Sequence, residues 1–225
     1  MKALEDSIIA LLNLFNTFTH SYGWSVILLT IAFKLVFYPL TKKQFQSMNR
    51  MKEIQPRLKE LQEQHKGNPQ QLQKEMMQLY KKHGVNPLGG CLPILLQMPI
   101  LIGLFMALNS QAFKEQVASA GQLGFLWIQD ITLHHPNVID ALVKDWTIVI
   151  LPVLVGLSTY LTQKFMGAVD PKMAPLMTFM PFMMVFISFS LPAGVLLYWA
   201  VSNFISAWQQ YGINKATPPA AVVKA

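Results

Sequence analysis

The sequence predicts an all-α polytopic membrane protein with five transmembrane helices, a cytoplasmic helical hairpin and an N-terminal amphipathic helix. Hydrophobic residues make up 52% of its 225 residues and charged residues only 13%, which is about half the charged share of soluble domains. Its mean hydropathy is +0.34. The apolar residues gather in five runs, each near the roughly 20 residues that a helix needs to cross a bilayer.

Residues 1–20 are predicted to form the amphipathic helix. Their apolar side chains recur at helical spacing: Leu4, Ile8, Leu11, Leu12, Phe15 and Phe18. We expect this helix to lie in the outer interface of the membrane; packing on the protein core is the alternative. The segment lacks a basic n-region, a cleavage site and a lipidation cysteine, so it is not a signal peptide. We expect an anchor or signal before Met1 in the natural protein.

The five-span core is predicted over residues 21–212. Its spans run from about Trp24 to Leu40, Cys91 to Asn109, Trp146 to Phe165, Ala174 to Leu191 and Gly194 to Tyr211. Proline recurs inside or at the ends of these spans, which is tolerated in lipid where neighbouring helices or water satisfy the freed carbonyl groups. A tight reversal at residues 191–194 separates the last two spans.

A basic segment, residues 41–85, follows the first span and is predicted to form the helical hairpin. Apolar residues recur every three or four positions on both sides of Gly67-Asn68-Pro69, where the helix should break. The segment holds ten of the 18 basic residues against four acidic ones, a net charge of +6. Its few aromatic residues make single-stranded nucleic acid a poor partner, so we expect no direct nucleic-acid readout.

Loop charge predicts the orientation in the membrane. The basic segment should face the cytoplasm. The loop over residues 110–145 carries more acidic than basic residues and should lie outside, and the short tail over residues 213–225 should lie in the cytoplasm. Five spans that alternate in this way place the N-terminus outside.

No arrangement of residues in the sequence is typical of a catalytic or cofactor site. The chain lacks zinc-ligand spacing, a phosphate-binding glycine loop and a nucleophile elbow. Its single cysteine, Cys91, excludes an internal disulfide and a cysteine-based metal cluster. We therefore expect no enzymatic activity, no metal and no cofactor.

Lys34 is the one charged residue that lies well inside a predicted span. A lysine near the centre of a membrane helix costs about 2.5–3.5 kcal/mol on insertion scales, so it normally faces protein or water and marks a functional site. The alternative is a lysine that extends along the helix to the membrane surface. The end of the span at Leu40 lies six residues away, about 9 Å along a helix, which the side chain reaches only partly.

Other polar residues in the spans are candidates for the same site. They are Thr30 in the first span, Gln97 in the second, Thr159 and Gln163 in the third, Thr178 in the fourth, and Ser202, Asn203, Ser206 and Gln210 in the fifth. Each alone is more often a hydrogen-bonding contact between helices. Together with Lys34 they predict a hydrated cationic groove that attracts acidic or polar polypeptide segments.

Short motifs occur in a fixed order along the chain: Tyr38-Pro39-Leu40-Thr41-Lys42, Asn86-Pro87-Leu88-Gly89-Gly90-Cys91, Gln97-Met98-Pro99-Ile100, Thr178-Phe179-Met180-Pro181, Pro192-Ala193-Gly194, Leu197-Tyr198-Trp199 and Ser202-Asn203. Over about residues 20–212 the sequence resembles the YidC membrane protein insertase family. The resemblance implies a bacterial inner-membrane protein that inserts and folds nascent membrane proteins, alone or with the Sec translocon. It also implies the ribosome, the signal recognition particle pathway and the lipid bilayer as partners.

The resemblance assigns roles to several residues. Thr30, Lys34 and Gln97 would line the groove, and Tyr198 and Trp199 would form a face along which the substrate slides. Many family members carry arginine where this chain has Lys34, so the positive charge is kept but the rigid guanidinium fork is lost. The long outer domain of Gram-negative members is absent from this sequence.

The sequence therefore predicts a membrane protein insertase. The alternative is a small-anion or solute transporter that uses Lys34 as its anion site. The absence of an internal repeat, of paired acidic residues and of glycine-broken helix pairs weighs against a transporter. A purely structural scaffold does not explain an unpaired charge within a span.

Overall fold

The structure, a computed structural model, describes residues 2–85, 92–134, 146–166 and 174–216. These residues are helical apart from turns, loops and one isolated antiparallel bridge between Phe125 and Ile128, which confirms the all-α class. The helices are α1 (Lys2–Thr19), α2 (Tyr22–Val36), α3 (Tyr38–Gln64), α4 (Pro69–Lys82), α5 (Leu92–Asn109), α6 (Gln111–Ser119), the 3₁₀ turn η2 (Trp146–Val149), α8 (Ile150–Met166), α9 (Ala174–Ser188) and α10 (Ala193–Ala216).

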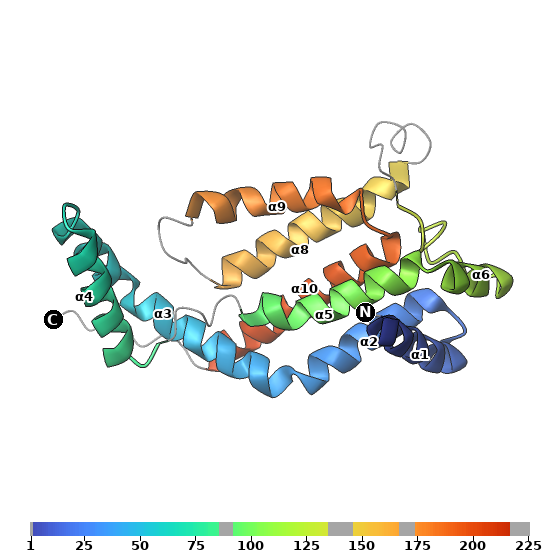
Figure 1. Cartoon of the computed structure of the whole chain (residues 1–225), viewed down its shortest axis with the longest axis horizontal. Coiled ribbons are helices and arrows are strands. Elements are labelled where there is room, and N and C mark those ends of the chain that lie inside the picture. Colours follow the sequence, from blue (N-terminus) through green and yellow to red (C-terminus); the bar gives the residue numbers. More distant parts are fainter. Residues whose placement is uncertain (1, 86–91, 135–145, 167–173, 217–225) are drawn as a thin grey trace.

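Helix α10 is the centre of the bundle formed by α2, α5, α8, α9 and α10. It contacts α8, α2, α3 and α5, while α9 packs on α8 (Figure 1). Its first half is buried almost all round, from Val195 to Tyr198. At the α8–α9 contact, a Cβ built on Gly156 would lie 2.5 Å from Val185 Cγ2. The small residue therefore lets these two apolar helices approach closely, as is common in membrane helix packing.

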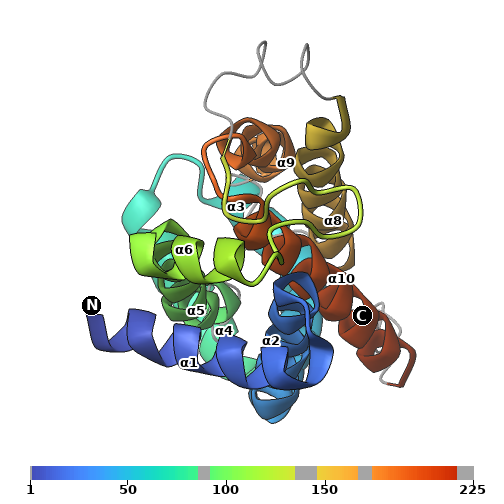
Figure 2. The same ribbon diagram turned by 90° about the vertical axis from the view of Figure 1, so that its right-hand side faces the viewer.

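Helix α1 lies across α2 and α5 (Figure 2). Ile8 and Leu12 of its apolar face are buried, and a Cβ on Gly103 of α5 would lie 2.8 Å from Ile8 Cγ1. Most of the face that we predicted to lie in the membrane interface thus contacts protein, as the alternative of core packing requires. Phe18 at its end is 76% exposed, and the interfacial location of the helix stays a prediction.

The first predicted span is not one straight helix. Helix α2 ends at Val36, and α3 begins after the single residue Phe37 at an angle of 66°. Pro39, in the first turn of α3, lacks the N–H that would donate to the carbonyl of Leu35 in a continuous helix. Lys34 consequently lies in the last turn of α2 and not beyond the middle of a longer helix.

Length and hydropathy do not by themselves identify five spans in the described residues. No single helix there is both long and apolar enough to cross a membrane. Two pairs of helices, each bent by 66°, meet these criteria jointly: α2 with α3, and residues 95–109 with α6. The number of spans stays a prediction.

Helices α3 and α4 form a hairpin that extends away from the bundle (Figure 1). Asn68 caps α4 by accepting a hydrogen bond from the backbone N–H of Gln71 at 3.1 Å, and Pro69 occupies the first position of that helix, where its missing N–H costs nothing. Ile54, Leu58 and Val85 form a small core of their own. The following turn, residues 86–91, lies outside the described residues.

The end of the bundle opposite the hairpin is closed by residues 120–134. The backbone N–H of Ala193 donates to the carbonyl of Leu133 at 2.9 Å, and that of Gly194 donates to Ile131 at 2.8 Å. A Cβ on Gly194 would lie 2.8 Å from Leu108 Cδ1, so glycine permits this close approach. The rest of the predicted outer loop, residues 135–145, and the end of the tail, residues 217–225, lie outside the described residues.

Candidate functional site

Polar side chains of α10 meet polar side chains of three other helices inside the apolar bundle. We call this set the polar cluster; its members are Lys34 of α2, Gln97 of α5, Ser158, Thr159 and Thr162 of α8, and Ser202, Asn203 and Ser206 of α10. The cluster joins α2, α5 and α8 to α10 through hydrogen bonds. The sequence could place these residues on particular helices but could not pair them.

Lys34 is half-buried and its Nζ donates to Ser206 Oγ at 2.7 Å. No aspartate or glutamate occurs within α2, α5, α8, α9 or α10. The lysine therefore has a neutral hydroxyl as its hydrogen-bond partner within the bundle, and its positive charge is not neutralised by any acidic residue of these helices. Such a charge attracts an anionic group more strongly in a low-dielectric surrounding than it would in water.

Thr30, which we predicted on the face of Lys34, is completely buried and donates to the carbonyl of Val26 at 2.7 Å. A threonine that bonds its own helix in this way satisfies its hydroxyl without an external partner. Thr30 thus lies one turn from Lys34, on the same side of α2, but its donor is used within the helix.

Gln97 and Ser202 form a reciprocal pair. Gln97 Nε2 donates to Ser202 Oγ at 2.8 Å, and the distance from Ser202 Oγ to Gln97 Oε1 is 3.2 Å. The side chain of Ser202 also interacts with the hydroxyl of Tyr198. The glutamine predicted from the second span is therefore held against α10, four residues before Ser206.

Asn203 connects α10 to α8. Its Nδ2 lies 3.1 Å from Thr159 Oγ1 and 3.3 Å from Ser158 Oγ, and its backbone carbonyl accepts from Thr162 Oγ1 at 3.3 Å. Ser158 and Thr162 were not among the predicted site residues. Ser158 and Thr162 are four residues apart and share a helix face, and Thr162 lies three residues after Thr159; this spacing was the signal that could have identified them.

Three other predicted site residues are not members of the polar cluster: Gln163, Tyr198 and Trp199. The Nε2 of Gln163 lies 3.2 Å from Met180 Sδ on α9, so this side chain bonds α9 and not α10. Tyr198 is only 1% exposed and Trp199 is half-buried against the core. A substrate reaches Tyr198 only if neighbouring helices move, and its role on a substrate-facing surface stays a prediction.

The described residues contain no group of three histidine, cysteine, aspartate or glutamate side chains placed to hold a metal ion. The polar cluster also contains no nucleophile with an adjacent general base and a third orienting group. Its hydroxyl and amide groups are used in contacts between helices. What the site offers chemically is one positive charge and a set of hydrogen-bonding groups.

Known proteins are similar to this chain in sequence and in fold. Residues 14–220 match the 60Kd inner membrane protein family. The chain is 40% identical over 216 residues to the membrane protein insertase YidC of Polynucleobacter necessarius subsp. necessarius (strain STIR1), covering 96% of this chain and 36% of that protein. It is also 40% identical over 207 residues to YidC of Wolinella succinogenes, covering 91% of this chain and 36% of that protein.

A solved structure supports the same assignment. A crystal structure of an active YidC insertase with its first transmembrane domain resolved matches with a TM-score of 0.69 and 25% identity, covering 92% of this chain and 46% of that chain. Of the two curated relatives in the preceding paragraph, the chain spans about a third of the length, 36% of each. Because the family match covers most of the chain, the protein belongs to the 60Kd inner membrane protein family, in which its relatives are YidC membrane protein insertases.

Proposed function

We propose that this chain is the core of a membrane protein insertase, which inserts and folds nascent membrane proteins. The observation that carries the proposal is Lys34: a positive charge among apolar helices, bonded to a serine hydroxyl and without an acidic partner in those helices. A cation among membrane helices is costly, so a protein keeps one where the charge serves a function. Family membership indicates which function.

The proposed mechanism needs no nucleotide, metal or covalent step. The hydrophobic segment of a client would leave along α2 and α8 into lipid, which is favourable by about 25 cal/mol for each Å² of apolar surface removed from water. Its polar flank would cross beside the polar cluster, where hydrogen-bonding groups and the charge of Lys34 reduce the cost of leaving water. This cost would be reduced most for acidic flanks.

The hydrated groove itself is part of the proposal. Its lining would consist of Thr30, Lys34, Gln97, Thr159, Gln163, Asn203, Tyr198 and Trp199. For the polar cluster to hydrate, α10 must part from α2 or α5 on the side that faces the hairpin, since residues 120–134 close the other end. The cluster would then exchange hydrogen bonds between helices for bonds to water and client.

The membrane location and the partners are proposed on the same basis. The chain would be a multi-pass protein of the bacterial inner membrane with its N-terminus outside and its C-terminus in the cytoplasm. The basic hairpin would face the cytoplasm and receive chains from the ribosome or the signal recognition particle pathway. The Sec translocon would be a further partner for some clients.

The test is insertion by the purified chain in liposomes. A small single-span client is added, and protease protection of its translocated flank is measured. We expect protection that depends on the protein, and no leak of chloride or phosphate through it. Chloride or phosphate flux without client protection would instead indicate the alternative function, an anion transporter that uses Lys34.

A further inference from the structure

Two buried glutamines are left without hydrogen-bond partners where α3 meets α10. Gln44 of α3 is 4% exposed and Gln210 of α10 is 1% exposed. Neither Nε2 nor Oε1 of either side chain has a partner among the described residues. Buried amides are almost always hydrogen-bonded in folded proteins, so four unpaired atoms in one region require an explanation.

Gln210 lies on α10 between two residues whose side chains bond other helices. Ser206, Gln210 and Asn214 follow one another at intervals of four residues and share a helix face. Ser206 bonds Lys34 of α2 at 2.7 Å, and Asn214 accepts from Asn49 Nδ2 of α3 at 2.8 Å. Gln210 therefore faces the stretch of chain between Lys34 and Asn49.

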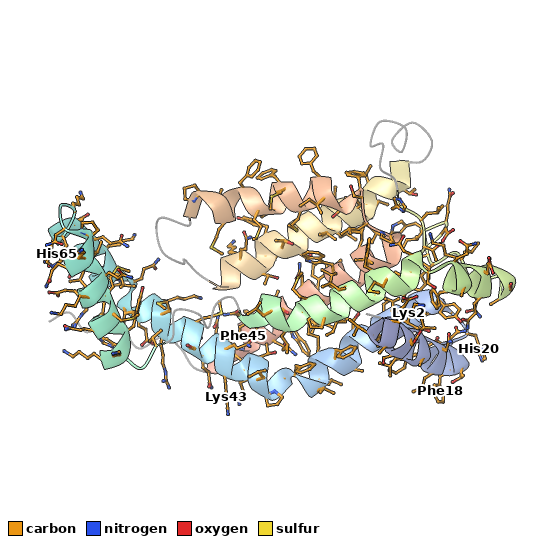
Figure 3. The ribbon with its side chains drawn as sticks, viewed as in Figure 1. Lys2, Phe18, His20, Lys43, Phe45 and His65 are labelled. Carbon is orange, nitrogen blue, oxygen red and sulfur yellow. The ribbon has the colours of Figure 1, made fainter. Side chains whose placement is uncertain are left out.

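Gln44 lies in that stretch. Its neighbour Phe45 and Met48, one turn further along α3, form a small buried cluster with Ile213 of α10. Figure 3 shows Phe45 on the side of α3 that faces the bundle and Lys43 on the opposite side. Gln44 lies one turn before Met48, on the same face of α3, and Gln210 lies one turn before Asn214 on α10. We therefore assign both unpaired amides to the region where α3 meets α10, at the end of the bundle from which the hairpin extends.

The chemistry of two amides restricts the ligand. Each side chain offers an N–H donor and a carbonyl acceptor. An anion such as a lipid phosphate would satisfy only the donors, and a cation only the acceptors. A peptide group carries one donor and one acceptor and is the same in every sequence. Two glutamines therefore suit the backbone of a polypeptide, independently of its side chains.

The geometry of the α3–α10 interface would allow it to open. Its contacts include the three-residue apolar cluster and the Asn49–Asn214 hydrogen bond, and α3 makes fewer contacts with α5 and α8. Helix α3 is joined to α2 only through Phe37, at a bend of 66°. A rotation about this residue would separate α3 from α10 without unfolding α2, whose residues pack in the large core with α5, α8 and α10.

We propose that Gln44 and Gln210 form a binding site for the backbone of a client polypeptide, reached when α3 separates from α10 about Phe37. The inference rests on the proposed insertase function. It adds a site that lies between the hairpin and Lys34 and binds a client independently of the client's sequence. The client would pass both sites, but their chemistry differs, since the two glutamines bind neutral peptide groups and Lys34 attracts anionic flanks.

Replacement of each amide by leucine tests the site. In Gln44→Leu and Gln210→Leu, we expect insertion to fall about five- to tenfold, the effect of one or two lost hydrogen bonds, and equally for clients with acidic and neutral flanks. The thermal midpoint in detergent should stay the same or rise, because an unpaired buried amide is replaced by an apolar group of similar size. Gln111→Leu, on the exposed face of α6, is the matched control.

The outcomes separate this inference from the insertase proposal. Undiminished insertion by both variants would overturn the site while wild-type insertion upholds the function. A lowered thermal midpoint would also overturn it, because the amides would then be satisfied in the resting protein by each other or by water. Failure of the wild type to insert any client would contradict the proposed function itself.

A reversible crosslink tests the opening. The side chains of Asn49 and Asn214 meet end to end at 2.8 Å, which places their Cβ atoms farther apart than a disulfide spans. Cysteines at both positions, in a Cys91→Ser background, can therefore be joined by a short bifunctional methanethiosulfonate reagent, which holds α3 against α10 and is released by reductant. We expect the crosslinked protein to lose insertion and the reduced protein to regain it, with each single-cysteine variant unaffected by the reagent. Normal insertion by the fully crosslinked protein would overturn the opening.

Discussion

At the scale of single residues, Ser206 has a role that its residue type alone does not indicate. Its Oγ accepts from Lys34 Nζ at 2.7 Å and holds the ammonium against α10. The bond involves an ionised donor, which makes it stronger than a bond between neutral groups. Ser202, one turn earlier, instead bonds the neutral amide of Gln97.

This difference predicts unequal effects of two matched substitutions. Ser206→Ala leaves the ammonium without its described partner and should lower the free energy of unfolding in detergent by about 1.5–3 kcal/mol. Ser202→Ala breaks contacts between neutral groups only, those with Gln97 and Tyr198, and should cost about 0.5–1.5 kcal/mol. Unfolding curves of the two variants provide the measurement. Equal costs, or a larger cost for Ser202→Ala, would contradict the assignment of Ser206 as the partner of a charged lysine.

The candidate residues could be found from the sequence, but their partners could not. A lysine in an apolar run is visible without a structure, as are Gln97 and Asn203. The pairing depends on the rotation of each helix about its axis, and α5 has apolar residues around its whole circumference, so its sequence contains no preferred face. The same ambiguity explains why Gln163, which contacts α9, was grouped with Thr159.

At the scale of elements, contacts made by glycines fix how helices approach one another. A Cβ on Gly23 of α2 would lie 2.0 Å from Phe125 Cγ, so any side chain there displaces the aromatic ring. Gly212 of α10 has nothing within 4 Å of the same position. The two glycines are both helical but differ completely in their surroundings.

We expect Gly23→Ala to destabilise the protein by about 1–3 kcal/mol, the cost of overpacking a well-filled site. Gly212→Ala should stabilise it by about 0.5–1 kcal/mol, because alanine favours a helix interior over glycine. Thermal unfolding of both variants in the same detergent distinguishes them. A Gly23→Ala protein as stable as the wild type would show that residues 120–134 do not pack on α2 in this way.

The hairpin is an element with a core of its own. Ile54, Leu58 and Val85 pack with one another, and α4 has no buried residue. Because Phe45 and Met48 hold the base of α3 against α10, replacing residues 52–78 with a flexible linker should leave the membrane bundle folded. We expect a monodisperse protein in detergent with reduced client insertion. Loss of the folded bundle would show that the hairpin supports it.

Sequence patterns predicted which elements form more accurately than they predicted where those elements begin and end. The break before Pro69 and the reversal before Gly194 follow from proline and glycine and lie where the structure has turns. The bend at Phe37 was missed, although Pro39 was in view, because the apolar run continues through it to Leu40. Hydrophobicity records which residues avoid water, whereas the missing N–H of Pro39 decides where the helix axis turns.

At the scale of the whole molecule, charge distribution predicts the orientation in the membrane. Gly67 lies at the tip of the hairpin and Ser119 is exposed at the end of α6. In a Cys91→Ser background, a membrane-impermeant thiol reagent should label Gly67→Cys only from the cytoplasmic side and Ser119→Cys only from outside. Labelling with the opposite sidedness would overturn both the orientation and the cytoplasmic opening of the proposed groove.

The central claim is that the charge of Lys34 contributes directly to insertion. The most direct measurement compares wild type, Lys34→Arg and Lys34→Leu in liposomes at equal protein level, with clients that differ only in an acidic or neutral translocated flank. Lys34→Arg should insert both clients like the wild type, because the charge remains. Lys34→Leu should stay folded, since leucine suits a membrane helix better than lysine does. It should lose insertion of the acidic-flank client more than of the neutral one. Equal and undiminished insertion of both clients by Lys34→Leu would contradict the account.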